Sequence, residues 1–364
     1  MRTRFQLTTS SLFGAFGSVA AVIVALLLGA VVISVAGSDP VEAYRALWDG
    51  AFVGRRSIGD TLIYTAPLIL GGLAFAVAAR AGMFNIGIEG QLVVGGFAAA
   101  LVGAWDFGLP KVIYLPLALV VAAVAGGIWG FIPGFLRAKT GAHEVITTIM
   151  LNYLAFRLIT YLVLKQDKYL PVSPNNLGTD KVVDAARLPR ILDGTRLHAG
   201  ILIALAAAVL LWFVLYHTTF GYNVRAVGLS RGASAYGGIN WGTTIMIAMT
   251  LAGAFAGLAG AGESLGLHGR HYTTPPGYGF TSIAVGLVGR NNPLAIILSG
   301  LLFGALSAGA PSMQSADVSK EIVLVIQGLI ILAVAALEVV RRLPTIRARM
   351  AKRTAARGAA RSGA

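Results

Sequence analysis

Polar residues that interrupt long apolar runs are the residues of this chain that could contact a solute or carry out chemistry. The first group lies at residues 84–91 (FNIGIEGQ), where Asn85 and Glu89 are four positions apart and would share one face of a helix. The three glycines within residues 82–90 favour an interruption of that helix. Two interpretations stay open: the polar side chains line a solute pathway, or they hold neighbouring helices together.

Two further polar groups follow along the chain. Glu144, Thr148 and Asn152 are spaced i, i+4 and i+8, which makes one face of a helix polar over about two turns. Residues 280–293 (FTSIAVGLVGRNNP) combine a short apolar run with a basic turn, and Pro293 must break a helix there. A charged group inside a membrane costs about 2.5–3.5 kcal/mol, so such groups usually face a cavity or a partner.

The residue types that are missing exclude most catalytic chemistry. The chain has no cysteine, which excludes disulfides, thiolate metal sites and cysteine nucleophiles. Its five histidines are scattered, with no carboxylate cluster at ligand spacing, so no metal site is expected. The sequence also lacks the P-loop, GxSxG and HExxH patterns. We therefore expect no catalytic residue, no cofactor and no ATP site in this chain.

The composition indicates a membrane protein. Of 364 residues, 56% are apolar and only 12% are charged, whereas a soluble domain has about 25% charged residues. A soluble enzyme, a coiled coil and a disordered chain are thereby excluded. The apolar runs predict an all-α polytopic membrane protein with about ten transmembrane helices, at residues 18–36, 61–79, 84–104, 112–136, 144–164, 199–217, 242–262, 278–290, 293–311 and 321–340.

The third and eighth of these segments contain the first and third polar groups. They are too polar or too short for plain spanning helices, so we expect broken or re-entrant helices there. Five spans separate the two, which predicts that they enter the membrane from opposite sides and favours inverted repeats.

Small residues recur four positions apart within several segments. Such spacing lets helix backbones approach closely in lipid. We interpret it as packing within one subunit, with a contact between subunits as the alternative. The positions are Gly126, Gly130 and Gly134, then Gly253 and Gly257, and finally Gly300 and Gly304.

The placement of lysine and arginine predicts that both termini are cytoplasmic. Residues 341–364 contain eight basic residues and no acid. The predicted organisation is an N-terminus (1–17), one transmembrane domain (18–340) and a basic tail (341–364) that faces anionic lipid rather than nucleic acid. A cleaved signal peptide within residues 1–36 is the alternative, but its apolar run is longer than usual.

Two long segments are predicted to lie outside the membrane. Residues 165–198 mix charges with prolines and predict an external loop or short hairpin, which serves as a solvated connector or as a docking surface. Residues 218–241 predict a cytoplasmic loop with a short helix capped by Ser230. Loops of this length are usually functional, so a helix that contacts a partner fits.

Several stretches together resemble a known family. RAVGLS at 225–230 and AYGGI at 235–239 are similar to the coupling segment of ABC importer permeases of the branched-chain amino acid and ribose superfamily. Within it, the nucleoside and simple-sugar permeases served by a basic-membrane-protein-type lipoprotein are most similar. Further agreement lies at residues 79–92, 144–155, 283–306 and 325–332. The chain departs from the pattern at Thr281 and at residues 230–232, where the family commonly has acids or proline.

The resemblance implies a permease subunit in the bacterial cytoplasmic membrane that carries nucleosides or related sugars. Its partners would be separate ABC ATPase subunits, a second permease (a different subunit or an identical one) and an external substrate-binding lipoprotein. The ATPase would contact Arg225, Gly228, Leu229, Arg231, Ala233, Tyr236, Gly237 and Gly238. The substrate pathway would use Phe84, Asn85, Glu89, Gln91, Asn152, Phe280, Thr281 and Ser282.

Two other classes of function compete with this interpretation. An ion-coupled secondary transporter acting without an ATPase would share the broken helices, and Glu89 is its candidate ion site. An intramembrane enzyme has no supporting motif. The coupling-type segment at 218–241 favours the ABC importer.

Overall fold

The computed structural model describes residues 9–165, 170–334 and 336, and the side chains from residue 19 onward. The predicted basic tail (341–364) and the first eight residues lie outside the described residues. Within the described part, the chain is almost entirely helical and its only strands are two residues long. The predicted all-α fold class is confirmed.

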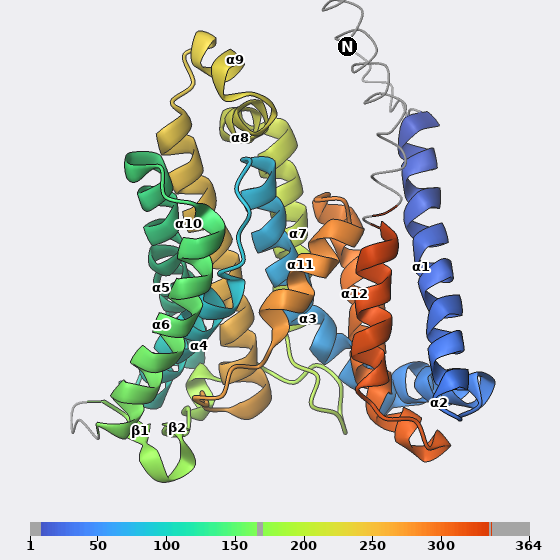
Figure 1. Cartoon of the computed structure of the whole chain (residues 1–364). Helices are drawn as coiled ribbons and strands as arrows, with labels where there is room; N and C mark the ends of the chain where they lie inside the picture. The colour runs from blue at the N-terminus through green and yellow to red at the C-terminus, as the bar shows by residue number, and fades with distance from the viewer. Residues whose placement is uncertain (1–8, 166–169, 335, 337–364) are drawn as a thin grey trace, which may run out of the picture. The chain divides into compact units, whose positions relative to one another are not determined.

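Every predicted apolar segment corresponds to a helix (Figure 1). The helices are α1 (Thr9–Val35), α2 (Pro40–Phe52), α3 (Arg55–Arg80), α4 (Ile88–Ala104), α5 (Lys111–Thr140), α6 (Glu144–Leu164), α7 (Gly200–His217), α8 (Thr219–Leu229), α9 (Arg231–Tyr236), α10 (Trp241–Ala261), α11 (Tyr278–Val288) and α12 (Pro293–Gly309), followed by Ile322–Val334. In the described part, six helices are long and apolar enough to cross a membrane, and α1 with α2 forms a seventh candidate. The shorter apolar helices include α4 and α11, the two predicted to be broken or re-entrant.

The segment predicted as an external loop forms short local structures. Strands β1 (Val172–Ser173) and β2 (Gly178–Thr179) pair as an antiparallel hairpin around a single 3₁₀ turn. A second 3₁₀ turn follows at Asp184–Ala186. Tyr272 forms a β-bridge with Gly178, so this hairpin is fixed to the segment before α11.

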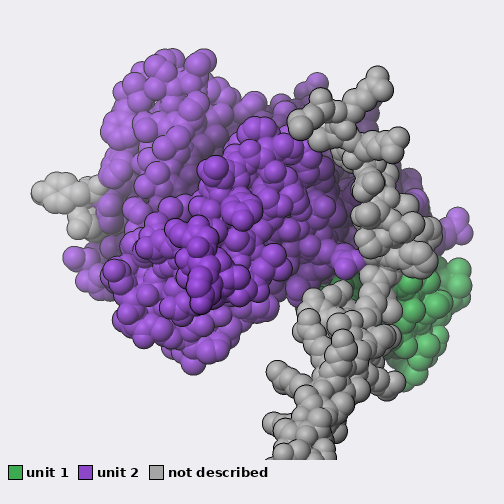
Figure 2. Space-filling model, turned by 90° about the horizontal axis from the view of Figure 1, so that it is seen from above, with its two compact units in different colours: residues 1–44, 313–364 green, residues 45–312 purple. Residues whose placement is uncertain are grey.

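The chain divides into two compact units, residues 1–44 with 313–364, and residues 45–312 (Figure 2). In the first unit, α1 packs on the helix Ile322–Val334, because a Cβ at Gly29 would lie 2.9 Å from the side chain of Ile326. The Tyr44 hydroxyl donates a hydrogen bond to the carbonyl of Leu26. The second unit holds α3 to α12 and both discontinuous helices.

Glycine faces let the central helices of the second unit touch through their backbones. A Cβ at Gly126 of α5 would lie 2.8 Å from the Cα of Gly257 of α10, and one at Gly130 would lie 3.0 Å from the Cα of Gly253. Such an approach is possible only without side chains, and it gains dispersion energy where lipid offers no hydrophobic driving force. The interpretation of these glycines as packing within one subunit is confirmed.

Replacing Gly253 with leucine should therefore destabilise the protein. The new side chain would meet the backbone of Gly126, which cannot yield without separating α5 from α10. We expect the free energy of unfolding to fall by about 1–3 kcal/mol or more, since about 1–3 kcal/mol is typical of overpacked cores. Thermal unfolding in detergent measures it. Gly328→Leu is the control, because a Cβ there meets nothing within 4 Å. Equal melting temperatures for the two variants would contradict the packing.

Candidate functional site

The chain between α3 and α4 is irregular and runs through the interior of the helix bundle (Figure 1). The turn begins at Gly82, whose φ of +77° is accessible to glycine at little cost. Residues 83–86 lie outside any helix, so most of their backbone polar groups, and the N–H groups at the start of α4, need partners elsewhere. The polar side chains singled out in the sequence supply them.

Asn85, in the irregular segment, is hydrogen-bonded to Gln91, in the first turn of α4. Asn85 Nδ2 donates to Gln91 Oε1 at 3.0 Å, and Gln91 Nε2 donates to Asn85 Oδ1 at 3.2 Å. Asn85 Oδ1 also accepts from the backbone N–H of Gly87 at 2.9 Å. Both side chains are almost fully buried. The amide pair thus joins the irregular segment to the first turn of α4.

Asn152, which belongs to the neighbouring helix α6, also bonds to the irregular segment and to the start of α4. Its Oδ1 accepts from the N–H of Gly90 at 2.8 Å and its Nδ2 donates to the carbonyl of Ile86 at 3.0 Å. Thr148, one turn earlier, is fully buried and lies against Gly87. Glu144 instead forms an ion pair with Arg137 at 3.3 Å. Of the three polar residues on this face of α6, Thr148 and Asn152 therefore face the irregular segment between α3 and α4, and Glu144 does not.

Glu89 connects the start of α4 to the start of α11. Its carboxylate accepts hydrogen bonds from the backbone N–H groups of Gly277, at 2.7 Å, and of Gly279. A Cβ at Gly279 would lie 2.6 Å from the backbone nitrogen of Glu89, so a glycine is needed there. The first N–H groups of a helix lack helical partners and carry partial positive charge, which a carboxylate neutralises. Glu89 is buried in this role.

The two short helices run apart from this meeting point. The C-terminal end of α11 lies beside the end of α3, where Arg80 Nε donates to the carbonyl of Asn291 at 2.8 Å. The C-terminal end of α4 lies beside the other end of the bundle, where Val183 N–H donates to the carbonyl of Gly103 at 2.9 Å. Two half-length helices therefore point their N-termini at one another inside the bundle.

The predicted pathway residues fall into two sets. The first set is buried and already has contacts inside the unit. Hydrogen bonds around the irregular segment before α4 use Asn85, Glu89, Gln91 and Asn152, and Ser282 lies against Gly71 of α3. Phe84 is 40% exposed and lies edge-on to Phe75. Phe280 is 62% exposed and Thr281 is half-buried. Of the predicted pathway residues, only Phe84, Phe280 and Thr281 have side chains that are accessible at the surface of the second unit.

The segment 218–241 contains two short helices, α8 and α9, at one end of the bundle (Figure 1). Ser230 caps α9 by accepting from the N–H of Ala233 at 3.3 Å, which confirms the predicted cap. Leu229 is 88% exposed and Tyr236 is 98% exposed. Ala233, Gly237 and Gly238 are exposed as well.

Other predicted coupling residues attach these helices to the bundle. The side of Gly228 that would carry a Cβ meets the carbonyl of Arg80, so α8 packs backbone to backbone on the end of α3. Arg225 lies 5.2 Å from the ring centroid of Tyr216, and Arg231 lies 4.0 Å from that of Trp241. Such cation–π contacts hold both arginines near the helix ends.

The sequence reasoning missed a polar cluster after α10. The helix continues as a π-helix, Gly262–His268, in which His268 Nε2 lies 3.5 Å from the carboxylate of Glu263. Next to it, Ser264 Oγ and His271 Nδ1 lie 3.0 Å apart. The sequence did carry a signal, since an acid, two histidines and Arg270 fall within nine residues at the end of an apolar run.

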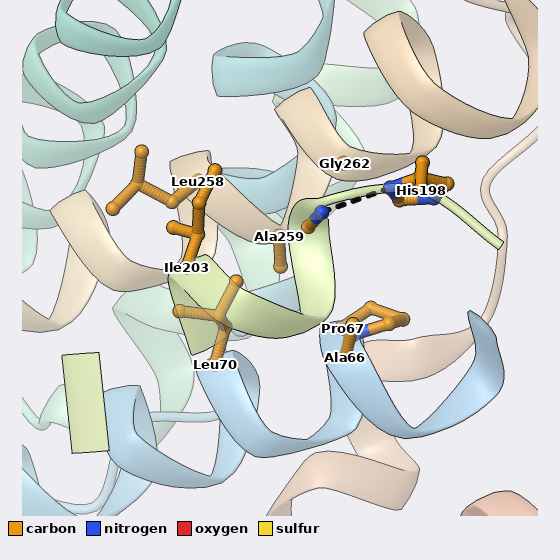
Figure 3. Close-up of a pocket in the computed structure, with 9 residues that line it drawn as sticks. Ala66, Pro67, Leu70, His198, Ile203, Leu258, Ala259 and Gly262 are labelled. Atoms are coloured by element: carbon orange, nitrogen blue, oxygen red, sulfur yellow. Dashed lines mark hydrogen bonds between the residues drawn. The ribbon is translucent and has the colours of Figure 1, made fainter. Parts of the chain in front are cut away.

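His198 supports the π-helix from the loop before α7. Its ring lies near Gly262 (Figure 3). A Cβ on Gly266 would lie 2.5 Å from Nδ1 of the same ring. Nδ1 accepts from the N–H of Gly200 at 3.2 Å. Burial lowers the pKa of His198 to about 4. Burial, with a smaller contribution from His268, lowers the pKa of His271 to about 3. Both rings are therefore neutral at physiological pH.

Apolar helices, two discontinuous helices that meet inside the bundle and an exposed helical pair at one end define a polytopic membrane permease. A family model described as branched-chain amino acid transport system / permease component matches residues 57–335, and the chain belongs to that family. It is a multi-pass transport subunit, not an enzyme, and as an ABC permease it acts with other subunits, including an ATPase.

Curated relatives cover most of the chain. The guanosine ABC transporter permease protein NupP of Bacillus subtilis is 43% identical over 88% of this chain and 93% of its own length. The nucleoside ABC transporter permease protein NupB of Lactococcus lactis is 35% identical over 86% and 89%. A glucose ABC transporter permease protein of Haloferax volcanii is 36% identical over 87% and 86%. No solved structure is significantly similar.

Glu89→Gln should destabilise the bundle. One of the two backbone N–H groups at the start of α11 would lose its acceptor and face an amide N–H₂ instead. Leaving such a buried donor unpaired costs about 1–3 kcal/mol. The melting temperature in detergent should fall accordingly. Glu42→Gln, the same change at an exposed position of α2, should leave it unchanged. An unchanged melting temperature for Glu89→Gln would contradict the proposed role of the carboxylate.

Proposed function

We propose that this chain is the membrane permease subunit of an ATP-driven importer for nucleosides or related simple sugars. The observation that carries the substrate class is the 43% identity, over 88% of the chain, to a permease named for guanosine transport. The two other relatives described above are named for nucleosides and for glucose. A polar, uncharged solute of this size crosses a membrane slowly without a protein path, which is the chemical need such a subunit meets.

The exposed pair α8–α9 is the proposed ATPase docking site. Leu229 and Tyr236 present large apolar surface at the end of the bundle, while Gly228 and Arg225 attach the pair to α3 and α7. An ATPase bound there would transmit its closure to α3, and through α3 to the break before α4. Binding of nucleotide would then shift the population between inward-open and outward-open states.

The proposed orientation follows from this docking site. α8 and α9 face the cytoplasm of a bacterial cell, on the inner side of its cytoplasmic membrane. The proposal that both termini are cytoplasmic rests separately on the placement of lysine and arginine in the sequence. The segment 165–198 faces outward and meets an external substrate-binding lipoprotein. A second permease, identical or different, completes the pore.

The proposed pathway is bordered by Phe84, Phe280 and Thr281, whose side chains are accessible. Asn85, Glu89, Gln91, Asn152 and Ser282 form the wall behind them and fix its shape. Aromatic faces can stack on a nucleobase, and the threonine hydroxyl can bond a sugar hydroxyl.

An ion-coupled transporter is the competing proposal, with Glu89 as its ion site. The hydrogen bonds of Glu89 weigh against it, because both carboxylate oxygens already accept backbone N–H groups. A cation would have to displace the start of α11.

Purification of the tagged protein from its own membranes in mild detergent, followed by reconstitution, tests the function. We expect a P-loop ATPase and a second permease to co-purify, and guanosine uptake to need ATP but no ion gradient. Glu89→Gln should lower uptake only in part, with no change in ion dependence. Uptake by the solitary protein, driven by an ion gradient without ATP and abolished in Glu89→Gln, would overturn the proposal.

Tyr236→Asp should detach the ATPase. Placing a charge where an apolar ring enters the partner should weaken the complex by roughly tenfold or more, about 1.4 kcal/mol. The measurement is the amount of ATPase that co-purifies with correctly inserted permease. Ile191→Asp is the matched control, since Ile191 is exposed in the segment 165–198 at the opposite end. Normal ATPase recovery with Tyr236→Asp would remove the docking assignment.

A further inference from the structure

A cavity of about 360 Å³ lies beside the π-helix, at the end of the second unit away from α8–α9. Its walls come from the π-helix, from the segment 269–277 before α11 and from the turn between β1 and β2. Its volume falls within the range of about 300–1,000 Å³ typical of small-molecule sites. None of the chemistry described above for the pathway uses it.

The backbone around this cavity is fixed in place. His271 N–H donates to Thr179 Oγ1 at 3.0 Å, and Thr179 N–H donates to the carbonyl of His271 at 2.9 Å. Tyr272 bridges to Gly178 of β2. On the other side, the ring of His198 fills the space left by Gly262 and Gly266 and supports the π-helix. π-helical turns are rare and are often found at functional sites.

The cavity is lined by polar groups with unused hydrogen-bonding capacity. His271 is only 6% exposed, and its Nε2 has no hydrogen-bond partner among the described residues, although Nδ1 pairs with Ser264. A buried polar atom without a partner costs about 1–3 kcal/mol. The carboxylate of Glu263 also lines the cavity, where it hydrogen-bonds with Tyr278 and lies 3.5 Å from His268. A carboxylate has about four acceptor sites, so these contacts leave some of them free. Both groups can therefore still bind a ligand.

The rest of the lining is mixed: Asn176, Arg270 and Thr274 are polar, and the remaining walls are apolar or aromatic. Leu92, Leu177, Pro275 and Pro276 form the walls, together with the ring of Tyr272. A few polar groups between flat apolar walls suit a planar heterocycle with N–H donors and ring acceptors.

The cavity adjoins the meeting point of the two short helices. Leu92 lies three residues after Glu89 in α4, and Pro276 directly precedes Gly277, which binds Glu89. A solute in the cavity would therefore touch both elements that close the interior of the bundle. Any shift of α11 that opens the interior must also move this wall of the cavity.

We propose that this cavity is an external site that binds the base of a purine nucleoside before translocation, with Glu263 accepting its N–H groups and His271 Nε2 pairing with a ring nitrogen or carbonyl. Guanine offers adjacent N–H donors on one edge and acceptors on another, which matches these two groups. The inference rests on the proposed function and adds to it a place of recognition within the permease.

The test uses the full transporter complex in nanodiscs without the external binding protein, and radiolabelled guanosine as the probe. Glu263→Gln should weaken guanosine binding at least tenfold, because the amide replaces one of the two acceptor oxygens with an N–H₂ donor and removes the negative charge. Thr274→Trp is a second variant at an exposed position of the lining, and it should reduce binding by filling the cavity. The matched controls are Asp184→Asn and Lys181→Trp, which are exposed in the segment 165–198 and do not line the cavity. Recovery of the complex and basal ATP hydrolysis should be unchanged in all four variants.

The outcomes separate this inference from the function itself. If the wild-type complex takes up no guanosine with ATP and its binding protein, the proposed function fails. If it takes up guanosine but shows no saturable binding without the binding protein, or if Glu263→Gln and Thr274→Trp bind like their controls, the cavity assignment is overturned. It is also overturned if these two variants lose only the docking of the binding protein while guanosine binding stays intact.

Discussion

The structure of the second unit depends on how it stabilises two helix N-termini inside an apolar bundle. Each N-terminus exposes N–H groups without helical partners and carries partial positive charge. Glu89, in the first turn of α4, gives the start of α11 both an acceptor for its free N–H groups and a negative charge. The carboxylate therefore neutralises the facing helix ends and ties them together. Its burial is tolerable because its charge is hydrogen-bonded to this positive region.

The amide groups around the break solve the remaining part of the same problem. Asn85 and Asn152 hydrogen-bond to the backbone of Ile86, Gly87 and Gly90, and Gln91 holds the Asn85 side chain in place. Glycines allow these side chains to come close enough, since a Cβ on Gly90 would lie 2.8 Å from Asn152 Oδ1. The irregular backbone can therefore cross the interior without contacting lipid, as membrane proteins require.

Much of this arrangement could be predicted from the sequence, because apolar length and small-residue spacing are local signals. The helices, the shortness of α4 and α11, the close packing of glycine-bearing helices and the Ser230 cap all follow from such signals, whereas the pairing of α5 with α10 does not. The partner of Glu89 could not be predicted, since Gly277 and Gly279 lie 188 and 190 residues away in a segment with no distinctive side chain. The cavity beside the π-helix was missed for a related reason. Its residues come from three separate segments, and a π-helical turn has no sequence pattern that reveals it.

The way in which the polar groups are used bears on where a solute can be recognised. The buried amides at the break bond to one another and to backbone, so they offer little to a passing solute. Phe84, Phe280 and Thr281 offer two rings and one hydroxyl, which can guide many small solutes but discriminate weakly among them. Strong discrimination needs polar groups left unpaired when the wrong solute binds. In the described part of the second unit, Glu263 and His271 fit that requirement best. Selection within the permease would therefore precede the narrow interior, where a solute can still be rejected before the helices move.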